Sequence, residues 1–304
     1  MIPLNHAQAV VYGELINAAY AMYEADPTNL TPKPKGIPSG FAMLAWIQMS
    51  DFAFESKFKK FYGFVAQNIL APATHVVVIR GTEGLVEWYD DAMAVKTPFT
   101  QVPSAGSVAS GFDDIYGTLQ VVKYTPPPLR TALEAAPAAP AAPAAATPLS
   151  GSFADQIAEV VRSTEPSRAL HASLMGLAAP PPPSVAVTGH SLGAALCTLY
   201  VMENAAKNKV HNPVICTFAS PRVGDHAFVA AFNKLPGLTS WHIKNTWDIV
   251  PKLPPALLGY GDVDQLYEFS SWGMVRFSPT CWHSMLTYMH WLDPKVALEP
   301  GCVP

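Results

Sequence analysis

The stretch V-A-V-T-G-H-S-L-G at residues 185–193 constrains the fold more than any other part of the chain. Its first four residues form a largely β-branched run that is typical of a buried strand, and residues 194–200 are small and compatible with a helix. Ser191 stands at the turn between them, flanked by Gly189 and Gly193, where strand and helix crowd together. We expect Ser191 to be a nucleophile at the apex of a strand–turn–helix elbow. The alternative is a purely structural turn.

Other segments predict the rest of an α/β architecture. Strands are expected from short apolar or β-branched runs at residues 41–49, 61–67, 75–79, 214–218 and 241–245. Helices are expected over residues 6–24, 83–95, 110–116, 153–162 and 283–292. Strands that alternate with helices are typical of a mostly parallel, doubly wound sheet. A chain of 304 residues can form one such domain.

A low-complexity segment at about residues 125–150 interrupts this pattern. Proline and alanine dominate it, so it cannot bury a core, and we expect a solvated, polyproline-like or mobile insertion. Strands of the same predicted sheet lie on both sides of it. We therefore expect a single domain over residues 1–304 rather than a boundary at the insertion.

Composition and charge exclude several classes of partner. Charged residues make up 14% of the chain, against a usual share of about 25%; this fits an enzyme that meets apolar substrate, although the Pro/Ala segment also dilutes the charge. A net charge of −4 without a Lys/Arg cluster argues against nucleic acid and anionic membranes. Residues 169–202 contain no Asp, Glu, Lys or Arg, but the prolines at 180–183 and the elbow forbid a continuous transmembrane helix.

The N-terminal sequence M-I-P-L-N-H-A-Q-A-V shows no basic region followed by an apolar one, so no signal peptide is expected. This leaves three locations open: the cytoplasm, export by another route, or the mature form of a secreted enzyme. The oligomeric state is equally open.

The four cysteines show no C-x-x-C spacing. Cys197 and Cys216 fall on the helix after the elbow and on a core strand, where free thiols usually fill space. A disulfide between Cys281 and Cys302 is possible in an exported form. The histidines include no H-x-x-x-H pair with a nearby acid, so no zinc site is expected, and no cofactor either.

A nucleophilic serine on such an elbow needs an acid and then a histidine later in the chain. Asp248 lies just past the predicted strand 241–245, at the edge of the sheet where ligands bind in such folds. Asp225 is better explained as a helix cap or loop anchor. Asp262 and Asp264 lie in a turn-rich stretch that does not match a calcium-binding loop. Asp248 is therefore the expected acid.

His283 is the expected base because it opens the last predicted helix directly after a loop. His290 lies inside that helix and is the next candidate. His242 and His6 fall within a predicted strand and the first predicted helix, and neither has a reason to reach the elbow. His190 adjoins the serine but should point away from it at the turn.

The oxyanion formed during acyl transfer requires two amide donors. The first should be Leu192, directly after the nucleophile, and the second Thr82, after the strand at residues 75–79. Thr82 could instead be only the N-cap of the following helix. Both roles are compatible, because the start of a capped helix also presents free amides.

Five sequence blocks carry a family resemblance: V-V-V-I-R-G-T, S-G-F-D-D-I-Y, V-T-G-H-S-L-G-A-A-L, T-F-A-S-P-R-V-G-D and N-T-W-D-I-V-P-K-L-P-P. Their order and spacing resemble those of the fungal-type class 3 lipases, from about residue 41 to the C-terminus. The resemblance implies an α/β-hydrolase fold, a catalytic triad of Ser191, Asp248 and His283, and oxyanion donors at Thr82 and Leu192. The Pro/Ala insertion departs from the family's pattern, and the block around His283, H-S-M-L-T-Y, is a short one.

Together these features predict a serine carboxylic-ester hydrolase that forms an acyl-enzyme, with acylglycerols as the first substrate candidate. A phospholipase or a feruloyl-type esterase is the alternative within the enzymes. A catalytically silent binding module on the same fold is the alternative outside them. The expected partner is a lipid or ester substrate, which an enzyme of this kind can meet at a lipid–water interface.

Residues 83–93 form a candidate lid. Winding them as a helix places Glu83, Glu87, Asp90 and Asp91 on one side and an apolar set on the other: Leu85, Val86, Trp88, Tyr89, Ala92 and Met93. The lipases that the sequence resembles carry a mobile cover at this position, directly after the oxyanion residue. The alternative is an ordinary surface helix fixed on the core.

Overall fold

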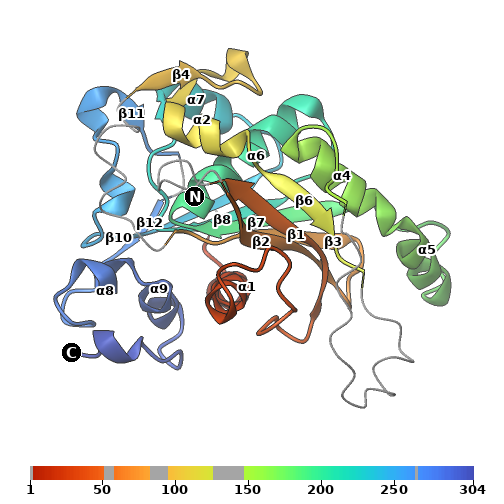
Figure 1. The fold of residues 1–304 in the computed structure, drawn as a ribbon, viewed down its shortest axis with the longest axis horizontal. Helices are drawn as coiled ribbons and strands as arrows, with labels where there is room; N and C mark the ends of the chain where they lie inside the picture. The colour runs from red at the N-terminus through yellow and green to blue at the C-terminus, as the bar shows by residue number, and fades with distance from the viewer. Residues whose placement is uncertain (1–2, 51–57, 83–94, 126–146, 264–265) are drawn as a thin grey trace.

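The fold is a central sheet of eight strands with helices on both faces (Figure 1), as seen in a computed structural model that describes residues 3–50, 58–82, 95–125, 147–263 and 266–304. The strand order is β12-β10-β8-β7-β3-β2-β1-β6. The bounds are β1 (Phe41–Ser50), β2 (Lys59–Asn68), β3 (Thr74–Ile79), β6 (Gln120–Lys123), β7 (Ser184–His190), β8 (Val214–Phe218), β10 (Thr239–Asn245) and β12 (Leu266–Phe269).

The sheet has a parallel half and an antiparallel half. Strands β3, β7, β8, β10 and β12 run parallel, and helices connect most of them. Strands β2, β1 and β6 are antiparallel. For β2 and β3 the reason is their connection, which is too short to carry a crossover helix and so forces a hairpin. The mostly parallel α/β-hydrolase sheet is confirmed, whereas the antiparallel edge was not predicted.

Two apolar layers hold the helices on the sheet, because alternate strand residues face opposite sides. Val77 packs into one layer, and its neighbours Val76 and Val78 pack into the other. The layer that contains Val77 buries α2 (Ser110–Tyr116), α4 (Phe153–Ser163), α6 (Leu192–Lys207) and α7 (His226–Phe232). The opposite layer buries α1 (His6–Ala25) and α9 (Met285–Leu292).

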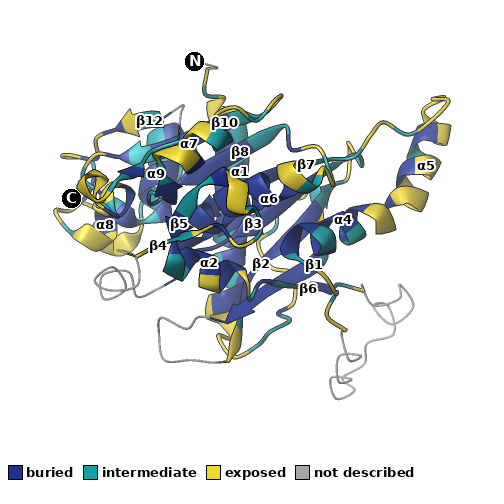
Figure 2. Cartoon of the chain, turned by 90° about the horizontal axis from the view of Figure 1, so that it is seen from above, coloured by how far each residue is buried: buried dark blue, intermediate teal, exposed yellow. Residues whose placement is uncertain are grey.

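The remaining elements are short. A second sheet has the order β11-β9-β5-β4 and consists of β4 (Lys96–Pro98), β5 (Ser107–Ala109), β9 (Gly224–Asp225) and β11 (Tyr260–Gly261). Helices α5 (Glu165–Leu174) and α8 (Pro279–His283) lie at opposite ends of the molecule (Figures 1 and 2). Single turns of 3-10 helix are η2 (Pro103–Ala105), η3 (Val250–Lys252), η4 (Ala256–Leu258) and η5 (Pro300–Cys302).

Two predicted boundaries are wrong. The helix expected over residues 283–292 is divided, since Ser284 is extended (ψ 131°) and His283 therefore ends α8 instead of opening the last helix. The Pro/Ala insertion also ends earlier than residue 150. Leu149 donates its N–H to the carbonyl of Val121 at 2.9 Å and so continues the edge of the sheet beside β6.

Other predictions concern segments that lie only partly within the described residues. Strands from both sides of the insertion pair in one sheet, and on this basis we propose a single domain over residues 1–304. The centre of the insertion, residues 126–146, and the candidate lid at residues 83–93 lie outside the described residues. Cys281 and Cys302 form a disulfide, and both free cysteines are buried.

Candidate active site

The turn between β7 and α6 has the geometry of a nucleophile elbow. Ser191 adopts φ 56° and ψ −125°, a strained backbone conformation for a residue with a side chain. A Cβ on Gly189 would lie 2.6 Å from the carbonyl carbon of Gly193. A Cβ on Gly193 would lie 2.2 Å from the carbonyl oxygen of Ile79 at the end of β3. Both glycines are thus needed for the close contact of the strand, the helix and β3.

Asp248, in the loop after β10, and His283, the last residue of α8, form a buried pair. The carboxylate Oδ2 of Asp248 lies 2.6 Å from Nδ1 of His283. The other oxygen, Oδ1, accepts the N–H of Val250 at 2.9 Å. A carboxylate can only accept, so Nδ1 carries the imidazole proton and Nε2 presents a lone pair. The histidine is therefore held in the tautomer that can take a proton.

Tyr288 provides a third hydrogen bond to Asp248. Its hydroxyl donates to Oδ2 at 2.8 Å and accepts the N–H of Asn245. Burial and the neighbouring Asp248 carboxylate hold the pKa of Tyr288 well above its usual value. The phenol therefore remains protonated and keeps donating to the carboxylate.

One side-chain atom each of Ser191 and His283 lacks a hydrogen-bond partner among the described residues. Ser191 Oγ and His283 Nε2 are both buried, and neither has a hydrogen-bond partner in the described part of the chain. A buried polar atom without a partner is costly, and such atoms are found preferentially at functional sites. The hydroxyl of Ser191 and the lone pair of His283 are thus available for proton transfer.

The other candidate acids and bases are engaged elsewhere. His290 Nδ1 lies 2.7 Å from the carbonyl oxygen of Val296, in the segment that follows α9. Asp225 caps α7, as the sequence predicted, by accepting the N–H of Phe228 at 2.8 Å. Asp264 lies outside the described residues.

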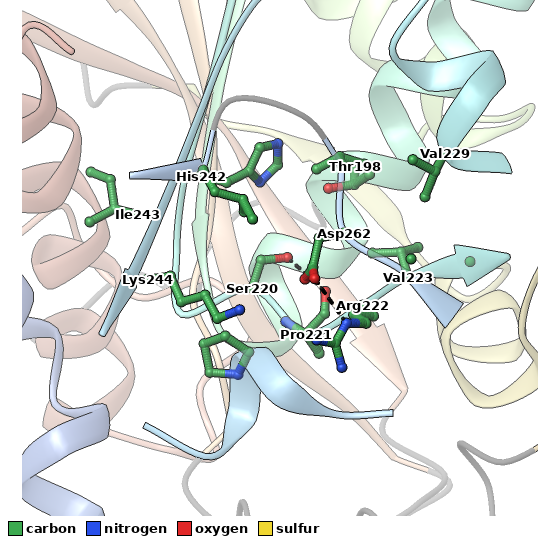
Figure 3. Close-up of a pocket in the computed structure, with 15 residues that line it drawn as sticks. Thr198, Ser220, Pro221, Arg222, Val223, Val229, His242, Ile243, Lys244 and Asp262 are labelled. Carbon is green, nitrogen blue, oxygen red and sulfur yellow. Dashed lines mark hydrogen bonds and ion pairs between the residues drawn. The ribbon is translucent and has the colours of Figure 1, made fainter. Parts of the chain in front are cut away.

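Asp262 and His242 line a separate small hollow beside α6 and α7 (Figure 3). Asp262 accepts a hydrogen bond from Arg222 Nε at 3.1 Å. His242 Nδ1 lies 2.6 Å from the hydroxyl of Thr217, and burial lowers the pKa of the imidazole to about 3. The hollow has a volume of about 20 Å³, which is room for one water molecule. No member of the predicted triad lines it.

Thr82 lies where the sequence places it, after β3 and directly after Gly81, which packs against Ser191. A Cβ on Gly81 would lie 2.9 Å from Cβ of Ser191. The buried guanidinium of Arg80, packed between two tyrosine rings, donates to the carbonyl of Gly81 at 2.6 Å. The N–H of Thr82 belongs to the same peptide unit and points the opposite way. Arg80 therefore turns the Thr82 amide away from itself.

Leu192 is the first residue of α6, so its amide has no partner within the helix. The positive end of the helix dipole adds to the attraction for an anion at this point. The elbow thus presents one amide donor beside Ser191, and the Arg80–Gly81 turn orients a second.

A directional chain of hydrogen bonds joins the turn before Thr82 to the backbone of His283. His190 Nε2 lies 2.9 Å from the carbonyl of His283, and that carbonyl can only accept, so Nε2 carries the proton. Burial, and then the neighbouring His283, lower the pKa of His190 well below its usual value, so the ring is neutral and Nδ1 accepts. The hydroxyl of Tyr20 donates to Nδ1 at 2.8 Å and accepts the N–H of Gly81 at 2.8 Å.

Tyr20→Phe is expected to lower kcat on p-nitrophenyl butyrate by about 10-fold, because removal of the hydroxyl frees both Gly81 and His190. KM and the melting temperature should change little. Tyr12→Phe, on the same helix, removes a hydroxyl bonded to Gln8 and is the matched control. An unchanged kcat in Tyr20→Phe, or an equal loss in both variants, would show that the chain does not position the site.

A cavity of about 490 Å³ lies beside Tyr20 and His190. Thr82, Asp248 and His283 line it, together with apolar side chains that include Ile249, Val250, Met285 and Leu286. Its volume is within the range of pockets that bind small organic ligands, and its lining suits an acyl chain. Among the described residues, no cluster of His, Cys, Asp or Glu could hold a metal ion.

Comparison with known proteins identifies the family. Residues 76–258 match the family model described as lipase (class 3). A phospholipase A1-II 7 of rice, Oryza sativa subsp. indica, is 30% identical over 85% of this chain and 62% of its own length. A phospholipase A1-II 1 of the same subspecies is 30% identical over 84% of this chain and 59% of its own length. The chain thus spans about three fifths of these relatives.

Solved structures share the fold at lower sequence identity. The Rhizomucor miehei lipase propeptide complex aligns with a TM-score of 0.54 and 20% identity, over 93% of this chain and 76% of that chain. A mono- and diacylglycerol lipase from Aspergillus oryzae aligns with a TM-score of 0.54 and 18% identity, over 87% and 80%. The family model covers more than half of the sequence and includes both the elbow and Asp248. The chain belongs to the class 3 lipase family.

Proposed function

We propose that this protein is a serine hydrolase that cleaves the carboxylic-ester bonds of lipids, with Ser191, His283 and Asp248 as its catalytic triad. The observation that carries the proposal is the Asp248–His283 bond of 2.6 Å. It fixes the proton on Nδ1 and leaves Nε2 free as a base. Family membership supports the reaction class.

In the proposed mechanism, Ser191 Oγ attacks the ester carbonyl while His283 Nε2 takes its proton. The buried Asp248 carboxylate stabilises the imidazolium that forms. The amides of Leu192 and Thr82 bind the negative charge on the carbonyl oxygen. His283 then protonates the leaving alcohol, and water repeats the sequence on the acyl-enzyme. The step needs no group beyond the substrate and water.

Two lipid classes compete as substrate. The sequence favours acylglycerols first and phospholipids second. The curated relatives that align with most of this chain are named phospholipases A1, at 30% identity, whereas the acylglycerol lipase with the same fold is 18% identical. This difference favours the phospholipid ester. Among the described residues, no helix is both long enough and apolar enough to cross a membrane.

The test compares substrates that share one acyl chain: dioctanoyl phosphatidylcholine micelles, emulsified trioctanoylglycerol and p-nitrophenyl octanoate, with methyl ferulate beside them. The expected order of kcat/KM is phosphatidylcholine, then triglyceride, with methyl ferulate far below both. Faster turnover of methyl ferulate than of either lipid would contradict a lipid ester hydrolase. Turnover of triglyceride alone would overturn the choice of phospholipid.

A further inference from the structure

A cluster of aromatic side chains borders the active site without belonging to it. Its members are Trp247, Trp272, Phe277 and Trp282, and we call them the aromatic cluster. The rings of Trp247 and Trp272 stack at 4.6 Å between centroids, and those of Phe277 and Trp282 meet edge-on at 4.6 Å. These contacts connect all four rings into one continuous surface.

Two of the four rings are largely exposed, while Trp247 and Trp282 are half-buried. Trp272 is 64% exposed and Phe277 is 67% exposed, and Ile249 beside Asp248 is 51% exposed. Figure 2 shows exposed residues around α8, where Trp282 lies. Large apolar side chains gathered on a surface expose area that water disfavours, and such patches mark interaction sites.

A disulfide, a backbone hydrogen bond and a small apolar core fix the segment that carries three of the four rings. The Cys281–Cys302 disulfide ties α8 to the C-terminal turn, and the N–H of Arg276 donates to the carbonyl of Cys302 at 2.9 Å. Val275 packs with both cysteines in a small core of its own. The segment between Ser271 and His283 is therefore held in a fixed structure. Its rings are exposed although the segment has a small core of its own.

The aromatic cluster is continuous with the active site. Trp247 immediately precedes the acid Asp248, and Trp282 immediately precedes the base His283. Ile249 and Pro279 line the cavity that Asp248 and His283 also line. A macromolecule seated on the cluster therefore reaches the mouth of the cavity. A protein partner there would obstruct substrate entry, whereas a lipid surface would supply substrate.

Charge selects the kind of lipid surface. Residues 269–292 contain no Asp or Glu, and Arg276 is the only Lys or Arg among them. Glu24 and Glu299 line the cavity, and the whole chain carries a net charge of −4. This excess of negative charge would repel an anionic membrane. Tryptophan rings, in contrast, suit the headgroup level of a neutral interface. We propose that the aromatic cluster docks the protein on a zwitterionic or neutral lipid surface.

This proposal extends the proposed function, and its test measures binding separately from hydrolysis. All variants carry Ser191→Ala, so that lipid remains intact during co-sedimentation with phosphatidylcholine vesicles. Trp272→Ser with Phe277→Ser is expected to lower the vesicle partition coefficient by on the order of 10-fold or more. Leu174→Ser, at a 77% exposed residue of α5 at the far end of the molecule, is the matched control and should bind as the parent does.

A second variant separates docking from misfolding. Trp272→Phe with Phe277→Leu keeps the surface apolar and should retain most of the binding. Quenching of tryptophan fluorescence by brominated phosphatidylcholine should occur in the parent and diminish in the serine pair. Equal vesicle binding by the parent and the serine pair would overturn the proposal. The proposal would also be overturned if light scattering showed the parent as a dimer and the serine pair as a monomer, with no change in vesicle binding.

Soluble substrate distinguishes the two proposals. With Ser191 restored, the serine pair should hydrolyse p-nitrophenyl butyrate within about 2-fold of the parent, because neither Trp272 nor Phe277 is among the described residues that line the cavity. A parent that binds vesicles but hydrolyses no ester would refute the proposed function alone. A parent that hydrolyses esters but whose vesicle binding is insensitive to the cluster would refute the docking surface alone.

Discussion

Replacing Ser191 with alanine is expected to reduce kcat on p-nitrophenyl butyrate by on the order of 10⁴-fold or more. The variant retains the amides of Leu192 and Thr82 and the cavity, so binding and oxyanion stabilisation account for the rate that remains. The strained turn should tolerate alanine, which is smaller than serine at a fully buried position. The melting temperature should therefore stay near that of the parent.

The two histidines provide the matched comparison for this loss. His283→Ala should be about as inactive as Ser191→Ala, and a double variant should lose little more, because the residues act as one unit. His290→Ala removes only a hydrogen bond to Val296 and should remain active. An inactive His290→Ala beside an active His283→Ala would refute the choice of base.

Asp248→Asn is expected to lower kcat by about 10³- to 10⁴-fold with little change in KM. The amide matches the carboxylate in size, but its NH₂ group can face Nδ1 of His283 and draw the imidazole into the other tautomer. The proton then sits on Nε2, which cannot accept the proton of Ser191. The hydroxyl of Tyr288 also loses part of its acceptor, so a modest fall in melting temperature accompanies the loss of activity.

Asp262→Asn is the control for that variant. It weakens the pair with Arg222 in the hollow of Figure 3 and leaves the triad untouched. Its kcat should stay near that of the parent. A variant Asp248→Asn with more than about a tenth of the parental kcat would show that the carboxylate does not set the tautomer.

Local patterns predicted the elements that chemistry constrains most. The elbow follows from two glycines whose absent side chains the turn demands, and β8 begins and ends at the residues that its apolar run indicates. The antiparallel edge of the sheet could not be read from periodicity, since a buried strand has the same apolar pattern in either direction. The break at Ser284 also escaped prediction, because the apolar spacing on its two sides is continuous.

The order of residues along the chain predicted the candidate site, and the prediction was incomplete for the same reason. The sequence placed Asp248 just past a strand and His283 at the start of the last helix, and the structure brings Asp248 Oδ2 within 2.6 Å of His283 Nδ1. Tyr20 gave no signal, because it lies on a helix expected only to pack, and its hydroxyl meets Gly81 and His190 from a distant part of the chain. Contacts of this kind depend on the tertiary arrangement. The lid predicted at residues 83–93 stays a prediction.

The most direct test of the proposed triad is labelling with a fluorophosphonate, which reacts only with an activated serine. The intact protein should gain one adduct, and peptide mapping should place it on Ser191. The label should be absent from Ser191→Ala and strongly slowed in His283→Ala. A protein that takes up no label, or one that is labelled at a different serine, would contradict the assignment of Ser191 as the nucleophile.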